Sequence, residues 1–169
     1  GLMKNIGFVL DGFVGGGTAR VTSIIANNLT HNEGICCYAL AYTRNGKPDI
    51  YPTKFPVQYV YDKTISMQRA ILKKHYLKIV RKFVKDNNID VLVACGVQFY
   101  PVVTLVAKVC GIKSICWEHI NPTTKNDFKF QDQCRMIGAN TSNCNVVLTK
   151  SALEIYNTRF KKKRNIQIY

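Results

Sequence analysis

The run Gly15-Gly16-Gly17 is the feature of the sequence best suited to binding a ligand. It follows an apolar segment, Lys4–Leu10, and opens a segment with helical periodicity, Gly17–Leu29. Glycine has no Cβ atom, so a ligand can approach the backbone closely, and the free N–H groups at a helix N-terminus attract phosphate or another anion. A tight connection between a strand and a helix also favours glycine, but one or two would be enough. The turn therefore predicts an anion-binding site.

Two common nucleotide-binding motifs do not fit this turn. The nicotinamide fingerprint would have a third glycine where Arg20 stands, and an acidic residue at the end of the second strand, which here ends at Tyr42-Thr43-Arg44. The missing acidic residue alone would still allow NADP, but the missing glycine argues against both cofactors. A phosphate-binding loop of the ATPase type is excluded because no Gly-Lys-Ser or Gly-Lys-Thr occurs.

His119 is the residue best placed to take part in chemistry. It follows Trp117 and Glu118 at the end of an apolar segment, and ligands of open parallel sheets bind outside the carboxyl ends of the strands. We expect its imidazole at the same edge as the glycine turn, although a hydrogen-bonded structural histidine would also fit. Further candidates for lining a cleft are Asp11, Arg20, Glu118 and Asn121. No Ser-His-Asp set, carboxylate pair or nucleophilic cysteine can be assembled from these loops, so the site is incomplete.

Cysteine usage and hydropathy indicate a cytoplasmic protein without a metal site. The seven cysteines include no CxxC pair and lie mostly in apolar segments, which is typical of reduced, buried thiols in the cytosol. The three histidines lie too far apart in the sequence for a zinc motif. No segment approaches the ~18 uninterrupted apolar residues that a membrane-spanning helix needs, and no signal-type apolar block opens the sequence.

The net charge points to an anionic partner. The formal net charge is +14. A predicted helix from about Ser66 to Asp86 carries seven Lys and Arg residues and no acidic residue before Asp86, and the segment Lys161–Arg164 is basic as well. Such a helix face is usually only solvated, but this imbalance also fits a peripheral contact with an anionic membrane. Nucleic acid is less well supported, because no DNA- or RNA-binding motif accompanies the charge.

Short apolar segments alternate with longer segments of helical period, which is typical of repeated βαβ units. The predicted strands are Lys4–Leu10, Ile35–Tyr42, Val57–Tyr61, Asp90–Cys95, Lys113–Trp117 and Asn145–Leu148. The predicted helices are Gly17–Leu29, Ser66–Asp86, Tyr100–Cys110, Asn126–Ala139 and Ser151–Phe160, with a capping box from Ser151 to Glu154. The pattern predicts one Rossmann-like α/β domain of three layers, α/β/α, with a mainly parallel sheet.

The order and spacing of these segments resemble the N-terminal domain of a family 4 glycosyltransferase, a retaining enzyme of the two-Rossmann GT-B fold. The resemblance covers nearly the whole chain and is carried by Ile6–Leu10, Gly15–Val21, Ile89–Val93, Gly111–Lys113, Trp117–Asn121 and Val146–Lys150. The family often has a glutamate where this chain has Ala19. Asn165–Tyr169 resembles the last strand before the family's interdomain linker, so residues 3–169 would be the N-terminal domain, with the C-terminal donor-binding domain absent from this chain.

The resemblance implies a role for each part of the site. The N-terminal domain would hold mainly the acceptor, Gly15, Gly16 and Gly17 would lie against the diphosphate and sugar of the donor, and His119 would contact the donor sugar near the reacting centre. It also implies transfer without a metal or other cofactor, since protein cations and helix ends neutralise the leaving diphosphate. We therefore expect the acceptor-side half of a retaining, metal-independent glycosyltransferase, which transfers a hexosyl group from a nucleotide sugar to a glycan or lipid-linked acceptor and is inactive by itself.

Two other functions remain open at this point. A stand-alone Rossmann-like module that binds an anion or phosphate would share the glycine turn but lack a catalytic partner domain. A nucleic-acid-binding domain is the third hypothesis, and it predicts an affinity for DNA or RNA that falls steeply with salt. The sequence encoded after Tyr169 distinguishes the enzyme from the module.

Overall fold

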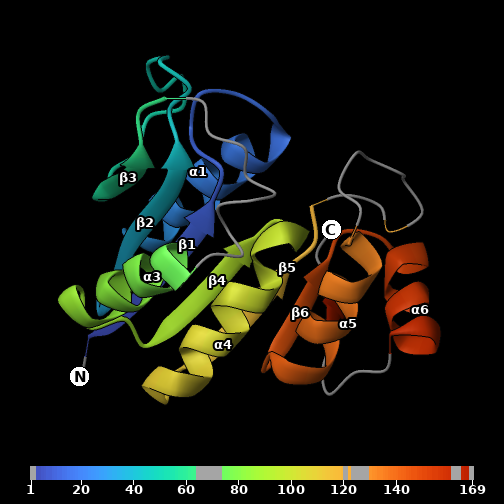
Figure 1. The fold of residues 1–169 in the computed structure, drawn as a ribbon. Coiled ribbons are helices and arrows are strands. Elements are labelled where there is room, and N and C mark those ends of the chain that lie inside the picture. Colours follow the sequence, from blue (N-terminus) through green and yellow to red (C-terminus); the bar gives the residue numbers. More distant parts are fainter. Residues whose placement is uncertain (1–2, 64–73, 120–121, 123–129, 161–164, 168–169) are drawn as a thin grey trace.

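Seven parallel strands form one open sheet in the computed structural model (Figure 1). The structure describes residues 3–63, 74–119, 122, 130–160 and 165–167. The strands stand in the order β3-β2-β1-β4-β5-β6-β7. Their bounds are β1 Lys4–Leu10, β2 Ile35–Thr43, β3 Val57–Tyr61, β4 Val91–Cys95, β5 Lys113–Trp117, β6 Cys144–Val147 and β7 Asn165–Gln167.

Helices cover both faces of the sheet (Figure 1). Their bounds are α1 Gly17–Leu29, α3 Lys74–Asp86, α4 Tyr100–Cys110, α5 Gln131–Thr141 and α6 Lys150–Arg159, with a short 3₁₀ helix, η1, at Val97–Phe99. Helices α3 and α4 pack with Cys134 of α5 in one core cluster, and α1 packs in another on the opposite face. The central strands are buried between these two clusters, which explains why β4 reads as a continuous apolar run.

The chain reverses its direction across the sheet at β1. It first adds β2 and β3 on one side of β1 and then β4 and β5 on the other, so β1 and β4 flank the switch point where ligands of open α/β sheets bind. The strand register aligns Val9 with Ala94 and Ala94 with Cys116. The first residues after β1, β4 and β5 therefore leave the sheet at the same level, and the loops that follow these strands share one edge.

The Rossmann-like three-layer fold predicted from the sequence is confirmed, and the bounds of α1 and α4 agree with the prediction. Helix α4 ends because Gly111 adopts the left-handed conformation, with φ 69° and ψ 29°. Helix α5 begins at Gln131, after the turn residue Phe130, and ends two residues later than predicted. The predicted helical residues 66–73 and 126–129 lie outside the described part of the chain.

The N-terminal cap of α6 corrects the sequence prediction. Thr149, not Ser151, caps the helix, and its Oγ1 accepts a hydrogen bond of 3.1 Å from the Ala152 N–H. Ser151 stands inside the first turn, with its Oγ 3.2 Å from the Thr149 hydroxyl. The capping-box spacing from Ser151 to Glu154 is therefore coincidental, because a residue already in the helix cannot take the extended backbone of a cap.

Candidate functional site

The glycine turn leaves the N-terminus of α1 open. Gly16 is the cap residue of α1 and has φ 92° and ψ 159°, a conformation that favours glycine. Among the residues that the structure describes, no side chain caps this helix, and its first turn contains no acidic residue. A Cβ atom at Gly16 or Gly17 would meet no atom of the described chain within 4 Å. Within the described residues, no side chain therefore competes for the first N–H groups of α1, which stand at the positive end of the helix dipole, an arrangement that binds phosphate and other anions.

Phe13 fixes the loop that leads into this turn. Its N–H donates to the Tyr59 hydroxyl at 3.0 Å, and its carbonyl oxygen accepts from the Ile50 N–H at 2.9 Å. The Tyr59 hydroxyl donates in turn to the Asp49 carboxylate. Burial and this hydrogen bond raise the pKa of Tyr59 to about 12, so the hydroxyl remains protonated at neutral pH. Strand β3 and the connection that precedes it thus hold the loop after β1 in place.

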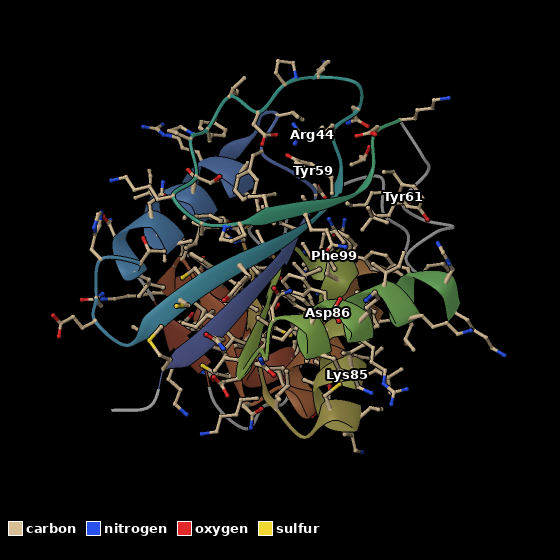
Figure 2. The ribbon with its side chains drawn as sticks, turned by 90° about the vertical axis from the view of Figure 1, so that its left-hand side faces the viewer. Arg44, Tyr59, Tyr61, Lys85, Asp86 and Phe99 are labelled. Carbon is tan, nitrogen blue, oxygen red and sulfur yellow. The ribbon has the colours of Figure 1, made fainter. Side chains whose placement is uncertain are left out.

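Arg44 belongs to the same group of side chains. Its guanidinium carbon lies 4.2 Å from the centre of the Tyr59 ring, and its Nη1 lies 3.5 Å from Asp49 Oδ1. Figure 2 shows Arg44 and Tyr59 next to each other at the end of the molecule formed by β2 and β3. Arg44 directly follows β2, where a dinucleotide-binding domain would carry its acidic residue. Sequence analysis missed the contact of Arg44 with Tyr59 and Asp49, because the three residues come from a strand end, a loop and the next strand.

Asp11 and Gln98 join the loops after β1 and β4. Gln98 Nε2 donates to Asp11 Oδ1 at 3.0 Å. Asp11 is exposed to solvent, but protein atoms also surround it. The resulting desolvation raises the pKa of Asp11, and the hydrogen bond from Gln98 lowers it by less. The position of Asp11 at the switch point suits hydrogen bonding to a bound ligand. Sequence analysis did not single out Gln98.

His119 stacks on the indole of Trp117 immediately after β5. The two ring centroids lie 4.3 Å apart with an interplanar angle of 35°. Burial lowers the pKa of His119 to about 4, so the imidazole is neutral at physiological pH. Its Nε2 atom is buried and has no hydrogen-bond partner among the residues that the structure describes. A neutral ring with a free nitrogen is suited to hydrogen-bond a ligand group rather than to act as a cation.

The Glu118 side chain points into the protein, so the expectation that it lines a cleft is wrong. Only 1% of the residue is exposed. Its carboxylate accepts two hydrogen bonds of 3.0 Å from Arg135 and one of 2.6 Å from the Tyr156 hydroxyl. A carboxylate can be buried only with such compensation. This network ties the end of β5 to α5 and α6, and it fixes the backbone that carries His119.

The structure brings most of the predicted site residues to one edge. The glycine turn and Asp11 follow β1, and His119 follows β5, which is separated from β1 by β4 alone. Strands β1 and β5 are thus two strand spacings apart, which corresponds to about 10 Å. Arg20 is exposed in the first turn of α1, where its N–H donates to the Gly16 carbonyl at 3.2 Å. Asn121 lies outside the described residues, and its contribution stays a prediction, as do those of Asp11 and Arg20.

Two features are absent from the part of the chain that the structure describes. No group of three His, Cys, Asp or Glu side chains there is placed to hold a metal ion. Within the same residues, no helix combines the length and apolar character needed to cross a membrane.

No protein-family profile matches the sequence, and no curated protein matches it. Solved structures do match. The lipopolysaccharide outer core galactosyltransferase WaaB in its apo form has a TM-score of 0.72 and 15% identity, over 94% of this chain and 43% of WaaB. UGT89C1 from Arabidopsis thaliana, complexed with UDP-L-rhamnose, has a TM-score of 0.64 and 16% identity, over 97% of this chain and 52% of its own.

A third match is the UDP-N-acetylglucosamine 2-epimerase from Rickettsia bellii, with a TM-score of 0.66 and 11% identity, over 96% of this chain and 44% of the epimerase. The chain thus spans about half the length of the solved structures that it matches. At these identities the likeness shows the fold alone. The chain is a Rossmann-like domain that corresponds to one half of the GT-B fold.

Proposed function

We propose that this chain is the N-terminal, acceptor-side half of a glycosyltransferase that moves a hexosyl group from a nucleotide sugar to a glycan or lipid-linked acceptor. The observation that carries the proposal is the open N-terminus of α1 at Gly16, at the same sheet edge as His119, within one half of a GT-B fold. A galactosyltransferase and a protein complexed with UDP-L-rhamnose are among the matching structures, which supports a nucleotide sugar as the donor.

In this proposal the N–H groups at the start of α1 hydrogen-bond the donor diphosphate. Negative charge grows on the diphosphate as its bond to the sugar breaks, and fixed dipoles already directed at that position stabilise the charge without reorganising. The neutral His119 imidazole hydrogen-bonds a hydroxyl of the donor sugar. Glu118 acts indirectly, because its contacts with Arg135 and Tyr156 position the backbone of His119 before the donor binds.

The remaining parts of the proposal follow the family 4 resemblance. Transfer would proceed with retention of configuration and without a metal ion, and a C-terminal domain would supply the other contacts to the nucleotide. The chain by itself would be inactive. The enzyme would work at the cytoplasmic face of a membrane, where lipid-linked or cell-surface polysaccharides are extended, and the net charge of +14 supports this location.

A full-length protein that contains this chain and a C-terminal domain provides the test. We expect it to release a nucleoside diphosphate from one member of a panel of nucleotide sugars and to glycosylate an acceptor. His119→Ala should lower turnover strongly without changing the circular dichroism spectrum. His31→Ala, a change at an exposed histidine beyond the end of α1, is the matched control and should leave turnover unchanged. Absence of both transfer and donor hydrolysis across the panel would contradict the proposal.

The epimerase match gives a second candidate within the same fold. An epimerase would return the nucleotide sugar with an inverted carbon and would glycosylate no acceptor. Nuclear magnetic resonance of the sugar recovered from the same assay separates the two activities. A stand-alone anion-binding module would show neither activity, and the sequence encoded after Tyr169 would then contain no second Rossmann-like pattern.

A further inference from the structure

Four cations form a stripe along the outer side of α3. They recur at spacings of four, three and four residues: Lys74, Lys78, Arg81 and Lys85. At 3.6 residues per turn they fall within an arc of roughly 60° and extend over about 16 Å. All four are exposed, and the buried residues of α3 occupy the opposite side of the helix.

Little negative charge compensates this stripe within the described residues. Asp86 is the only acidic residue of α3, and its carboxylate is bound at 2.7 Å by Lys82, which lies outside the stripe. Figure 2 shows Lys85 and Asp86, at the C-terminal end of α3, well apart from Arg44 and Tyr59, so this end of the stripe lies away from the edge that carries the candidate site. The stripe is therefore a separate cationic surface.

Helix α4 exposes two apolar side chains, and one of them, Val109, lines a groove together with cations of the stripe. Leu105 is 48% exposed and Val109 is 59% exposed, and they stand one helical turn apart. A groove of about 430 Å³ between the two helices is lined by Arg81 and Lys85 on one side and by Val109 on the other. Its floor includes Val84 and Ile89. Cationic and apolar groups therefore meet on one continuous surface, which we call the α3–α4 surface.

We infer that the α3–α4 surface, defined by Lys74, Lys78, Arg81, Lys85, Leu105 and Val109, docks on an anionic lipid bilayer. A bilayer offers both chemistries at once, since phosphate-bearing headgroups face the cations and the apolar boundary beneath them accepts Leu105 and Val109. A nucleic acid would bind the cations but give the apolar pair no partner. The inference does not depend on sugar transfer, so its test and that of the proposed function can fail separately.

This arrangement would also serve the proposed function. Helix α3 runs from the carboxyl ends of the strands to their amino ends, because it connects the parallel strands β3 and β4. A bilayer along α3 would therefore extend to the sheet edge that carries the glycine turn. A lipid-linked acceptor would then be presented beside that edge.

Flotation of the 169-residue chain with vesicles tests the inference. We expect binding to vesicles of phosphatidylcholine mixed with phosphatidylglycerol and none to phosphatidylcholine alone. Each surface cation contributes about fivefold to such partitioning, so Arg81→Gln with Lys85→Gln should lower it roughly 25-fold at low salt. Lys47→Gln with Lys54→Gln removes the same charge from exposed positions in the connection between β2 and β3, outside the α3–α4 surface, and should lower partitioning clearly less, because the contribution of a cation falls off with its distance from the lipid.

The apolar pair gives an independent measurement. Leu105→Ser with Val109→Ser leaves the charge unchanged and should weaken binding at both low and high salt, whereas the cation variants should differ from wild type mainly at low salt. Equal losses in the Arg81/Lys85 and Lys47/Lys54 variants would overturn the inference, because binding would then follow net charge alone. Unchanged binding of the serine variant would also overturn it. So would binding to an oligonucleotide that depends on Arg81 and Lys85 and is tighter than binding to the vesicles.

Discussion

Replacing Arg135 with methionine tests the buried network beneath His119, because methionine keeps much of the side-chain volume and removes the charge. Arg135 and Glu118 are each 1% exposed and share two hydrogen bonds of 3.0 Å. Without Arg135, the Glu118 carboxylate keeps only its 2.6 Å bond from Tyr156 among the contacts described above. A buried charge left without its partner costs about 3–5 kcal/mol. For a chain of this length that corresponds to a fall in Tm of roughly 6–20 °C.

The single tryptophan of the sequence provides the assay. Trp117 is 5% exposed and stacks on His119, so its fluorescence in urea reports unfolding at the site itself. Asp132→Asn is the matched control, because this carboxylate is 44% exposed and its contact with Arg135 should contribute less than about 1 kcal/mol. Adding Glu118→Gln to the Arg135 variant should recover most of the loss. A cost below about 1 kcal/mol for Arg135→Met, or no recovery in the double variant, would refute the reasoning.

Three further changes test other parts of the structure. Burial lowers the pKa of His119 from 6.5 to about 4, so the ring is harder to protonate in the folded protein than in the unfolded chain. The stability that the neutral ring contributes is complete above pH 6.5 and decreases as the pH falls towards 4, by at most about 3 kcal/mol. Urea unfolding of wild type and His119→Gln over this range measures the loss, and parallel curves would contradict it. Gly16→Ala should cost about 1–3 kcal/mol, because φ 92° with ψ 159° is a conformation almost restricted to glycine, whereas Gly17→Ala, at a helical position, should stay within about 0.5 kcal/mol; equal thermal shifts would disprove this difference. Thr149→Ala should cost about 1 kcal/mol as the loss of a cap, and Ser151→Ala should cost less, so the reverse ranking in thermal unfolding would restore Ser151 as the cap.

Much of the fold could be predicted because local signals agree with tertiary structure. Helix α4 has apolar residues on its inner side and Gly111 directly after its last turn, so period and stop signal give the same boundary. The cap of α6 could not be predicted in this way. Thr149 and Ser151 are both competent cap residues, and only the extended backbone of Thr149, with φ −134° and ψ 156°, distinguishes them.

The site was predictable as an edge but not as a set of contacts. The rule for open sheets selected the loops that carry the glycine turn and His119. It could not show that Glu118 turns inward, because its partners Arg135 and Tyr156 lie 17 and 38 residues further along the chain. The same limit hid the contact between Tyr59 and Phe13, which lie 46 residues apart. Such pairings depend on the sheet order, and sequence spacing contains no direct record of it.

The sequence separation within the Glu118 network also bears on synthesis by the ribosome. The glycine turn needs only β1, α1 and the neighbouring strands around it, all of which come early in translation. Glu118 must wait for Arg135 and then for Tyr156, near the end of this chain. Until α6 has emerged, the Glu118 carboxylate can pair with Arg135 but lacks its hydrogen bond from Tyr156. The two ends of the candidate site are thus completed at different times, the anion-binding end first and the histidine end last.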